Sequence, residues 1–204
     1  MAYLTEASKA ALTAAVEQVE RGSSAELVIA VRAHSGSLVA DLLGGVLAAL
    51  GTLAFMLFSP YPFSLSSILF DTFVCGLLGA FACSRSAGMR HLLLPRRVAD
   101  ANVRLAARAE FFDGGIADTS GRTGILVFVS QTERRVEVLA DSGVRRAVDV
   151  ATWDAWVGEL KRVVRDERDG LKLAAVVSAI AQPLSACLPR AHDDVNELGD
   201  QVRG

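Results

Sequence analysis

The chain has 204 residues, a formal net charge of −2 and 51% hydrophobic residues, with a mean hydropathy of +0.36. This length accommodates one soluble domain of ordinary size and a short membrane-inserted segment. The balanced charge, with no basic face, argues against a nucleic-acid-binding protein. The three cysteines lack a metal-like spacing, and Cys75 and Cys83 lie within a long apolar run. A disulfide framework is therefore not expected, which suits a reducing compartment.

The sequence pattern of residues 1–36 predicts one helix and one strand. Apolar residues recur with helical spacing from Leu4 to Val19, and Gly22 follows as a stop signal; this pattern is typical of an amphipathic helix. Residues 26–32 form an apolar run rich in β-branched side chains, which predicts a buried strand. One helix and one strand cannot form a hydrophobic core by themselves.

Residues 42–83 are dominated by apolar side chains, and Asp71 is the only Asp, Glu, Lys or Arg among them. The sequence Pro60-Tyr61-Pro62 divides the run into residues 42–58 and 63–83. A bilayer core of ~30 Å is crossed by about 20 helical residues, and irregular backbone is not tolerated in contact with lipid. The sequence therefore predicts a hairpin of two transmembrane helices.

The distribution of basic residues predicts how this hairpin is oriented. The turn between the spans has no Lys or Arg, whereas the flanks carry Arg32 on one side and Arg85, Arg90, Arg96 and Arg97 on the other. By the positive-inside rule, both termini should be cytoplasmic, as in a protein of the bacterial inner membrane. Small residues four apart in both spans either allow close helix packing or reflect the abundance of Gly and Ala in membrane helices.

Residues 97–204 predict the remaining elements of an α/β domain. A helix should begin near Arg97 and end at Gly114-Gly115, and the runs 125–129 and 135–140 should pair as an antiparallel hairpin. A helix capped by Thr152 and another starting at Asp169-Gly170 follow, and Pro183 should kink or restart the latter. The segment 193–200 is acidic and should be solvated.

Neither soluble piece is complete without the other, because the central strand 125–129 lacks a neighbour that residues 26–32 supply. We therefore expect one α/β domain built from residues 1–36 and 97–204, a small three-layer α/β/α sandwich interrupted by the transmembrane hairpin and its flanks, residues 37–96.

Several sequence blocks resemble the TPM domain family. They are residues 123–130 (TGILVFVS), 133–143 (ERRVEVLADSG), Trp153, Gly170-Leu171 and 193–198 (DDVNEL). The family includes chloroplast lumenal proteins of photosystem II repair and many bacterial membrane proteins, and its integral-membrane branch is the most similar. The resemblance implies a three-layer α/β/α fold; some members are described as acid phosphatases, and some bind calcium. This chain has Arg122-Thr123-Gly124 where the family usually has Asp-Asn-Gly, and Asp141-Ser142-Gly143 where Gly-Tyr-Gly is common.

A right-handed crossover would make strands 26–32 and 125–129 parallel and would gather Asp118, Thr119, Arg122, Asp141 and Ser142 at one edge of the sheet, here called the rim. The oxygens of Asp118, Asp141 and Ser142 suit calcium or magnesium, and Arg122 suits a bidentate anion contact. In the alternative interpretation, Asp141 caps the following helical turn and Asp118 makes a loop hydrogen bond.

Other candidate residues each have an ordinary structural interpretation. Asp71 within a span is either functional or part of the contact between the spans, with Ser66, Ser67 and Thr72 as partners. The acidic segment 193–200 is a second possible cation site, but it lacks the spacing of an EF-hand loop. Ser130 beside Glu133 is more typical of a hairpin turn than of a nucleophile with its base, and the three histidines are far apart in sequence.

Three functions follow as hypotheses. The first is a non-catalytic adaptor, tethered to the lipid bilayer, that binds another membrane protein during assembly or quality control. The second is a weak divalent-metal-dependent phosphatase that uses Asp118 and Asp141. The third is ion or small-molecule passage that involves Asp71.

Overall fold

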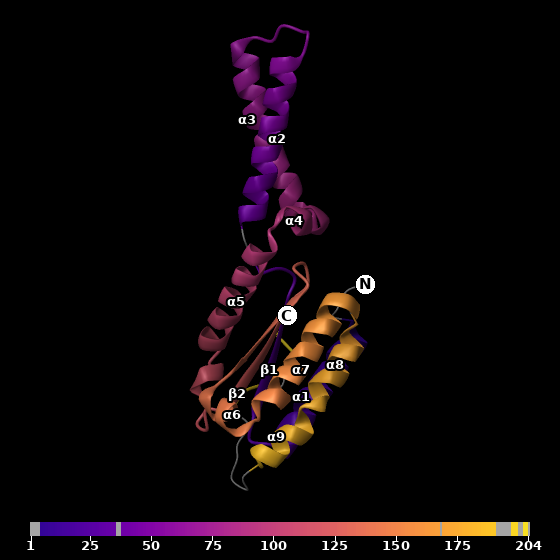
Figure 1. Ribbon diagram of the computed structural model, residues 1–204, viewed down its shortest axis with the longest axis vertical. Coiled ribbons are helices and arrows are strands. Elements are labelled where there is room, and N and C mark those ends of the chain that lie inside the picture. The colour runs from indigo at the N-terminus through magenta and orange to yellow at the C-terminus, as the bar shows by residue number, and fades with distance from the viewer. Residues whose placement is uncertain (1–4, 36–37, 168, 191–196, 200–201, 204) are drawn as a thin grey trace. The chain divides into compact units, whose positions relative to one another are not determined.

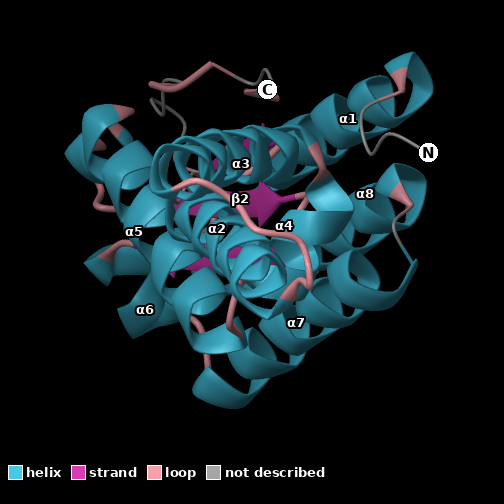
Figure 2. Cartoon of the chain, turned by 90° about the horizontal axis from the view of Figure 1, so that it is seen from above, coloured by secondary structure: helices cyan, strands magenta, loops and turns pink. Residues whose placement is uncertain are grey.

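The structure is a computed structural model that describes residues 5–35, 38–167, 169–190, 197–199 and 202–203. The chain divides into two compact units, Met1–Ser35 with Val103–Gly204, and Gly36–Asn102. Within these described residues, helices predominate over a three-stranded sheet, so the protein belongs to the mixed α/β class (Figure 2).

The first unit contains the sheet and the helices packed on it (Figure 1). Its elements are α1 (Glu6–Gly22), β1 (Glu26–Arg32), most of α5 (Arg96–Asp113), the 3₁₀ turn η1 (Ile116–Asp118), β2 (Gly124–Ser130), β3 (Arg135–Ala140), α6 (Ser142–Ala147), α7 (Val150–Arg162), the π-helical segment η2 (Val163–Glu167), α8 (Gly170–Ala179) and α9 (Ala181–Cys187).

The strand order is β1-β2-β3. β1 pairs with β2 in parallel, from Glu26 opposite Gly124 to Arg32 opposite Ser130, and β2 pairs with β3 antiparallel. Every residue of β2 is buried, as expected of a central strand with both faces covered. The parallel and antiparallel pairings that the sequence predicted are confirmed.

The two faces of the sheet are covered by different helices, because successive side chains of a strand point to opposite sides. Leu27, Ile29, Ile125 and Val127 lie in a core cluster with side chains of α1, α7, α8 and α9. Val28, Ala30, Leu126 and Phe128 lie in a second cluster with Val103, Ala107 and Phe111 of α5.

Local sequence explains where these helices begin and end. Thr5 and Ser8 form a reciprocal capping box at the start of α1, which satisfies two backbone N–H groups at the helix N-terminus. Asp149, rather than the predicted Thr152, is the N-cap of α7 and accepts from the N–H groups of Ala151 and Thr152. The sequence did not distinguish Asp149 from Thr152 as the N-cap, because Asp and Thr are both favoured at that position.

The apolar C-terminal helix is divided in two at Ile180, between α8 and α9. Pro183 has no N–H for the carbonyl of Ala179, and its ring crowds that carbonyl, so the predicted interruption is confirmed.

The second unit is built on α2 (Leu38–Phe58) and α3 (Leu65–Arg85), followed by α4 (Ala87–Leu93) and the first turns of α5. α4 was not predicted from the sequence; Ser86 caps it by accepting from the N–H of Met89. α2 and α3 run antiparallel: Gly44 lies against Cys83 at one end, and Gly76 lies against Ala49 further along.

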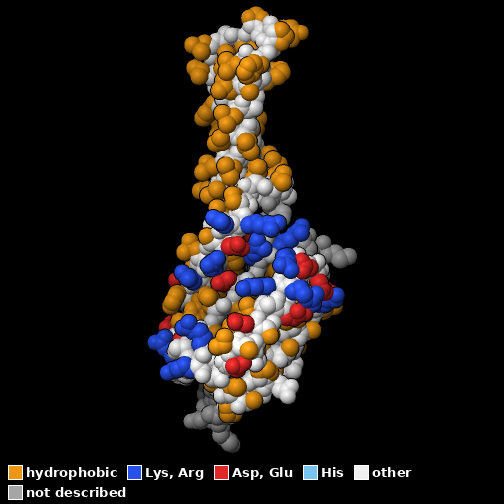
Figure 3. Space-filling model, in the orientation of Figure 1, with side chains coloured by type: hydrophobic (Ala, Val, Ile, Leu, Met, Phe, Trp, Pro, Cys, Tyr) orange, Lys and Arg blue, Asp and Glu red, His pale blue; other side chains and the backbone are white. Residues whose placement is uncertain are grey.

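The outward surface of α2 and α3 is apolar. Figure 3 shows hydrophobic side chains along the visible face of this pair, and large exposed side chains include Leu42, Leu50, Phe55, Phe58, Leu69, Phe70, Phe73 and Leu77. Within the described residues, three helices are long and apolar enough to cross a membrane: Leu38–Phe58, Leu65–Arg85 and Gly170–Cys187. The third differs from the others because its Leu173, Val177 and Leu184 are fully buried in the core of the first unit.

Candidate functional site

Asp141 is the best-defined residue of the rim. It is the N-cap of α6, and its Oδ1 accepts from the backbone N–H of Ser142 at 2.5 Å. Its Oδ2 lies 3.7 Å from Nη1 of Arg122 and has no hydrogen bond to the residues that the structure describes. The structure therefore brings Arg122, Asp141 and Ser142 together in a capped, ion-paired turn.

Backbone contacts hold this turn against the sheet. Arg122 adopts a left-handed conformation with φ of 54°, and its carbonyl accepts from the N–H of Gly143 at 2.9 Å. A Cβ at Gly143 would lie 2.6 Å from that carbonyl oxygen, so the close approach requires glycine. Nη1 of Arg122 also donates to the carbonyl of Ala117 at 3.3 Å.

Asp118 and Thr119 lie on the loop that leads into β2. Asp118 is exposed at the end of η1, and its N–H donates to the carbonyl of Gly115. Thr119 is buried, and its hydroxyl accepts from the N–H of Thr123 at 3.0 Å. No hydrogen bond or ion pair within the described part of the chain joins Asp118 to Asp141.

The rim residues do not fit a divalent cation well. Calcium takes six to eight oxygen ligands, yet the described residues contain no group of three His, Cys, Asp or Glu side chains that could hold a metal ion. The guanidinium of Arg122 already supplies a positive charge beside Asp141.

The described end of the acidic segment contributes to the rim in a way that the sequence did not predict. The carboxylate of Glu197 accepts from the N–H of Ser120 at 3.1 and 3.2 Å and from its hydroxyl. Glu26, buried at the start of β1, accepts from the N–H groups of Glu197 and Leu198. In the sequence, the signal for this contact was the carboxylate of Glu26 at the start of an otherwise apolar strand. Residues 193–196 of the acidic segment lie outside the described residues.

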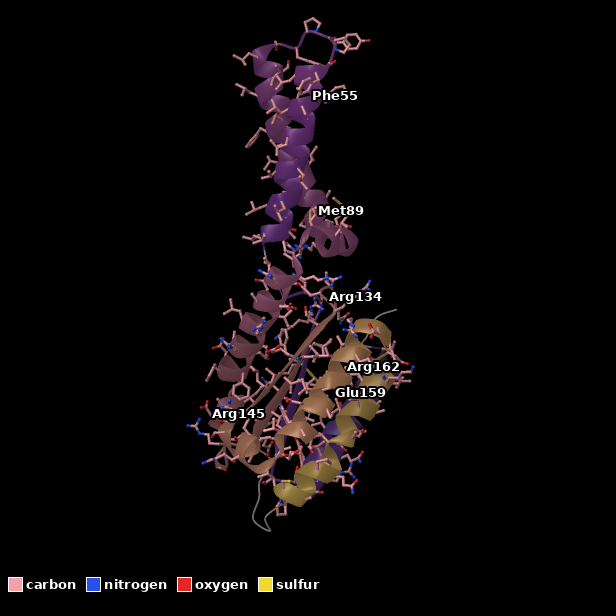
Figure 4. The ribbon with its side chains drawn as sticks, viewed as in Figure 1. Phe55, Met89, Arg134, Arg145, Glu159 and Arg162 are labelled. Atoms are coloured by element: carbon pink, nitrogen blue, oxygen red, sulfur yellow. The ribbon has the colours of Figure 1, made fainter. Side chains whose placement is uncertain are left out.

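Ser130 and Glu133 form a structural contact near the β2–β3 turn. The hydroxyl of Ser130 donates to Glu133, and the same carboxylate accepts from the N–H of Ser35 at 3.2 Å. Arg134, labelled in Figure 4, completes the turn with φ of 54°. Glu133 thereby ties the exit of β1 to the hairpin, in agreement with the turn interpretation.

In the sequence, the histidines and the exposed charges of α7 lie away from the rim positions discussed above. His34 is exposed, while the side chain of His91 and the whole of His192 lie outside the described residues. Glu159 and Arg162 pair on α7 (Figure 4), and the hydrogen bond from Arg162 lowers the pKa of Glu159. This exposed pair is a solvated surface contact of small energetic weight.

Asp71 lies half-buried on α3. Ser66 and Ser67, two of its predicted partners, hydrogen-bond to Ser64 instead. The hydroxyl of Thr72 is buried and has no partner among the described residues. Likewise, none of the hydrogen bonds or ion pairs described for the chain involves Asp71.

A polar contact that the sequence did not reveal joins α2 to α4. Nε and Nη2 of Arg90 lie 3.1 and 2.8 Å from the two carboxylate oxygens of Asp41, and the two side chains are only 17% and 13% exposed. A bidentate pair of this kind is strong and directional. In the sequence, the signal for this pair was Asp41, an isolated carboxylate in the first turn of an apolar helix, together with Arg90 in the flank after the second apolar helix.

Comparison with known proteins supports the fold class. Neither a scan against models of known protein families nor a search of curated proteins found a match. Among solved structures, the chain is similar to the NMR structure of BA42 protein from the psychrophilic bacterium Bizionia argentinensis, with a TM-score of 0.59, 14% sequence identity, and coverage of 98% of this chain and 94% of that chain. At this identity the likeness establishes a mixed α/β fold and nothing about activity.

Proposed function

We propose that the protein is anchored in a membrane by α2 and α3 and acts as a non-catalytic adaptor. The observation that carries the anchor is the apolar outer surface of this helix pair, where Phe58 is 89% exposed and Leu65 is 73% exposed. Soluble proteins rarely expose apolar patches above a few hundred Å² unless these meet a partner or a membrane. Two helices of 21 residues each match the thickness of a bilayer.

The orientation rests on charge. Arg85, Arg90, Arg96 and Arg97 follow α3, whereas the turn between α2 and α3 has no basic residue. Arg85 also lies over the ring of Phe81, 5.0 Å from its centroid, as interfacial arginines do when their stems remain in apolar surroundings. We place both termini and the α/β unit in the cytoplasm, at the bacterial inner membrane.

The α/β unit is proposed to be a TPM-like three-layer α/β/α sandwich. The two core clusters on opposite faces of the sheet support the layering, and the sequence blocks described above support the family. The adaptor role rests on that resemblance and on the structural contacts made by Asp141, Glu133 and Glu197. Phosphatase activity and passage through Asp71 stay predictions from the sequence.

The adaptor is tested by site-specific photo-crosslinking in intact bacterial membranes. A photoreactive residue replaces Arg145 on α6 or Lys161 on α7, both exposed, in the full-length chain. We expect at least one position to give a discrete adduct with an integral membrane protein, competed by unlabelled chain. Adducts with soluble proteins only, or no competition, would contradict the adaptor.

A phosphatase assay on the same full-length protein separates the two hypotheses. We expect no phosphate release from p-nitrophenyl phosphate that depends on Ca²⁺ or Mg²⁺. Divalent-dependent release that is lost in Asp141→Ala and retained in Arg145→Ala would establish the phosphatase instead.

A further inference from the structure

The outer edge of β1 is covered by a short segment of the same chain. β1 is an edge strand of the sheet, and Arg203 forms a parallel bridge with Ala30. The N–H of Val31 donates to the carbonyl of Arg203 at 2.7 Å, and the N–H of Arg203 donates to the carbonyl of Ile29 at 2.9 Å. These bonds are the pattern by which an added strand extends a sheet.

Contacts of residues 197–198 and 202–203 also position these residues beside β1. Glu26, the first residue of β1, holds the N–H groups of Glu197 and Leu198, and Arg203 lies beside the far end of the strand. Leu198 packs against the cluster under α5, and Val202 packs against the cluster on the other face of the sheet. Val202 and Leu198 therefore lie against opposite faces of the sheet, and Arg203 bridges to β1 in parallel.

A charged cleft of about 500 Å³ lies beside this edge, within the first unit. It is lined by Arg32, His34, Ser35, Glu110, Asp113 and Arg203, among others. The guanidinium of Arg203 reaches Oε1 of Glu110 at 3.5 Å and the carbonyl of Gly114 at 3.4 Å, whereas Arg32 holds the other oxygen of Glu110 at 2.7 Å. The contacts of Arg203 are long ones, and its side chain remains 33% exposed.

The charged side chains of the cleft are the carboxylates of Glu110 and Asp113 and the guanidinium groups of Arg32 and Arg203. Burial by itself would raise the pKa of Glu110, but hydrogen bonds and charge from Arg32, and then from Arg203, outweigh it, so the pKa lies below its ordinary value. Asp113 makes no hydrogen bond or ion pair to the residues that the structure describes. Arg203 thus leaves one carboxylate of the cleft for another positive group.

We propose that the outer edge of β1 and this cleft bind an extended segment of a partner protein, in parallel, with a basic side chain directed at Glu110 and Asp113. Residues 202–203 hold the same place in the free chain. The inference rests on the proposed adaptor function and gives its partner a chemistry: an exposed strand-forming segment with an arginine or lysine.

An intramolecular occupant competes with a partner at the high effective concentration of a tethered ligand, in the mM range for short flexible linkers. Weakening the contact of residues 202–203 should therefore strengthen binding of a free peptide. The probe is a fluorescent synthetic peptide with the sequence of residues 197–204, tested against the full-length protein in nanodiscs. The variant is Arg203→Glu, and the matched control is Arg145→Glu, an exposed arginine on α6.

We expect the peptide to bind Arg203→Glu at least tenfold more tightly than the unchanged chain or Arg145→Glu, and a peptide in which arginine is replaced by glutamate not to bind. A folded Arg203→Glu protein that binds neither peptide would overturn the proposal. If this variant does not fold, the unchanged chain is titrated to high peptide concentration. Amide shifts confined to residues 27–31 and 110–114 would support the proposal, and shifts elsewhere or none would overturn it.

Two further results separate this inference from its premise. A dimer that exchanges residues 202–203, detected by light scattering of the unchanged chain, would overturn it in favour of a second copy as occupant. Photo-crosslinks from α6 or α7 to a membrane protein, together with no peptide binding at β1, would leave the adaptor intact and remove this edge as its docking site.

Discussion

Gly143 shows how a single residue holds the rim together. A Cβ added there would lie 2.6 Å from the carbonyl oxygen of Arg122 and 2.7 Å from that of Gly121. Both are backbone atoms of the turn that leads into β2, so neither can swing away as a side-chain end would. The same turn holds Arg122 next to Asp141.

Gly143→Ala should destabilise the first unit by about 1–3 kcal/mol, the usual cost of forcing extra volume into packed structure. Gly158, in the middle of α7, has no atom within 4 Å of an added Cβ. Gly158→Ala should therefore stabilise by roughly 0.5–1 kcal/mol, because alanine favours a helix interior over glycine. Urea unfolding of the two variants measures both effects; equal effects would contradict the geometry of the turn.

Because of the shifted pKa of Glu110, the free energy of unfolding should depend on pH. Its pKa in the folded protein lies below the ordinary value of 4.5, because Arg32 and Arg203 outweigh the effect of burial. A depressed folded-state pKa gives stability that is fully present above the unfolded-state pKa and is lost as pH falls through the folded-state pKa.

Unfolding free energies of the unchanged chain and Glu110→Gln should therefore differ most near pH 7 and converge as pH falls below about 4, near the pKa of a free glutamate. The groups around Glu110 are Arg32 from β1, Arg203 and the nearby Asp113 of α5. Asp100→Asn, on the same helix but outside the cleft lining, is the control. A difference that does not change with pH would show that the ion pairs add no stability.

At the scale of elements, local patterns located the strands closely. The predicted runs 26–32, 125–129 and 135–140 became Glu26–Arg32, Gly124–Ser130 and Arg135–Ala140. Apolar β-branched runs bounded by Gly, Ser and Asp are strong signals, and the Gly170 helix start was similarly clear. The α4 helix was missed because Ser and Gly around it are weak helix formers, and its cap hydrogen bond depends on local geometry.

The candidate site was less predictable because its contacts are made between distant parts of the chain. Sequence reasoning brought Arg122, Asp141 and Ser142 to one edge, and the structure places them together. It could not reveal that Glu197 would bind Ser120, or that Arg203 would bridge to Ala30. Those contacts depend on which distant parts of the chain meet in three dimensions, and local sequence periodicity does not indicate this.

The contact between α2 and α3 depends on small residues. A Cβ at Gly79 would lie 2.4 Å from Cβ of Ala48 and 2.8 Å from the carbonyl oxygen of Gly44. Such close approach gives the van der Waals contact that holds helices together in lipid. Gly51, on α2, has no neighbouring atom within 4 Å of an added Cβ and provides a matched position outside the contact.

Gly79→Leu should weaken the helix pair by about 1–3 kcal/mol, as overpacking does, whereas Gly51→Leu should be nearly neutral. Detergent-induced unfolding in SDS, followed by energy transfer between labels at the two ends of the pair, gives the measurement. Similar losses for both variants would mean that the packing face lies elsewhere.

At the scale of the whole molecule, the proposed function needs a cytoplasmic α/β unit and a pair of membrane-spanning helices. The anchor depends on the exposed apolar surface of α2 and α3 and on the arginines that follow α3. The third apolar helix, Gly170–Cys187, contributes Leu173 and Leu184 to the core of the first unit. The proposed anchor therefore has two spans, with the residues before α2 and after α3 on the same side of the membrane.

Cysteine accessibility in intact cells tests this arrangement most directly. In a chain with Cys75 and Cys187 replaced by serine, new cysteines are placed at Tyr61, in the exposed turn between α2 and α3, or at Lys161 of α7; the remaining Cys83 is fully buried. We expect a membrane-impermeant maleimide to label Tyr61→Cys in intact spheroplasts and Lys161→Cys only after permeabilisation. Labelling of both positions from the same side, or release of the protein from membranes by alkaline carbonate, would contradict it.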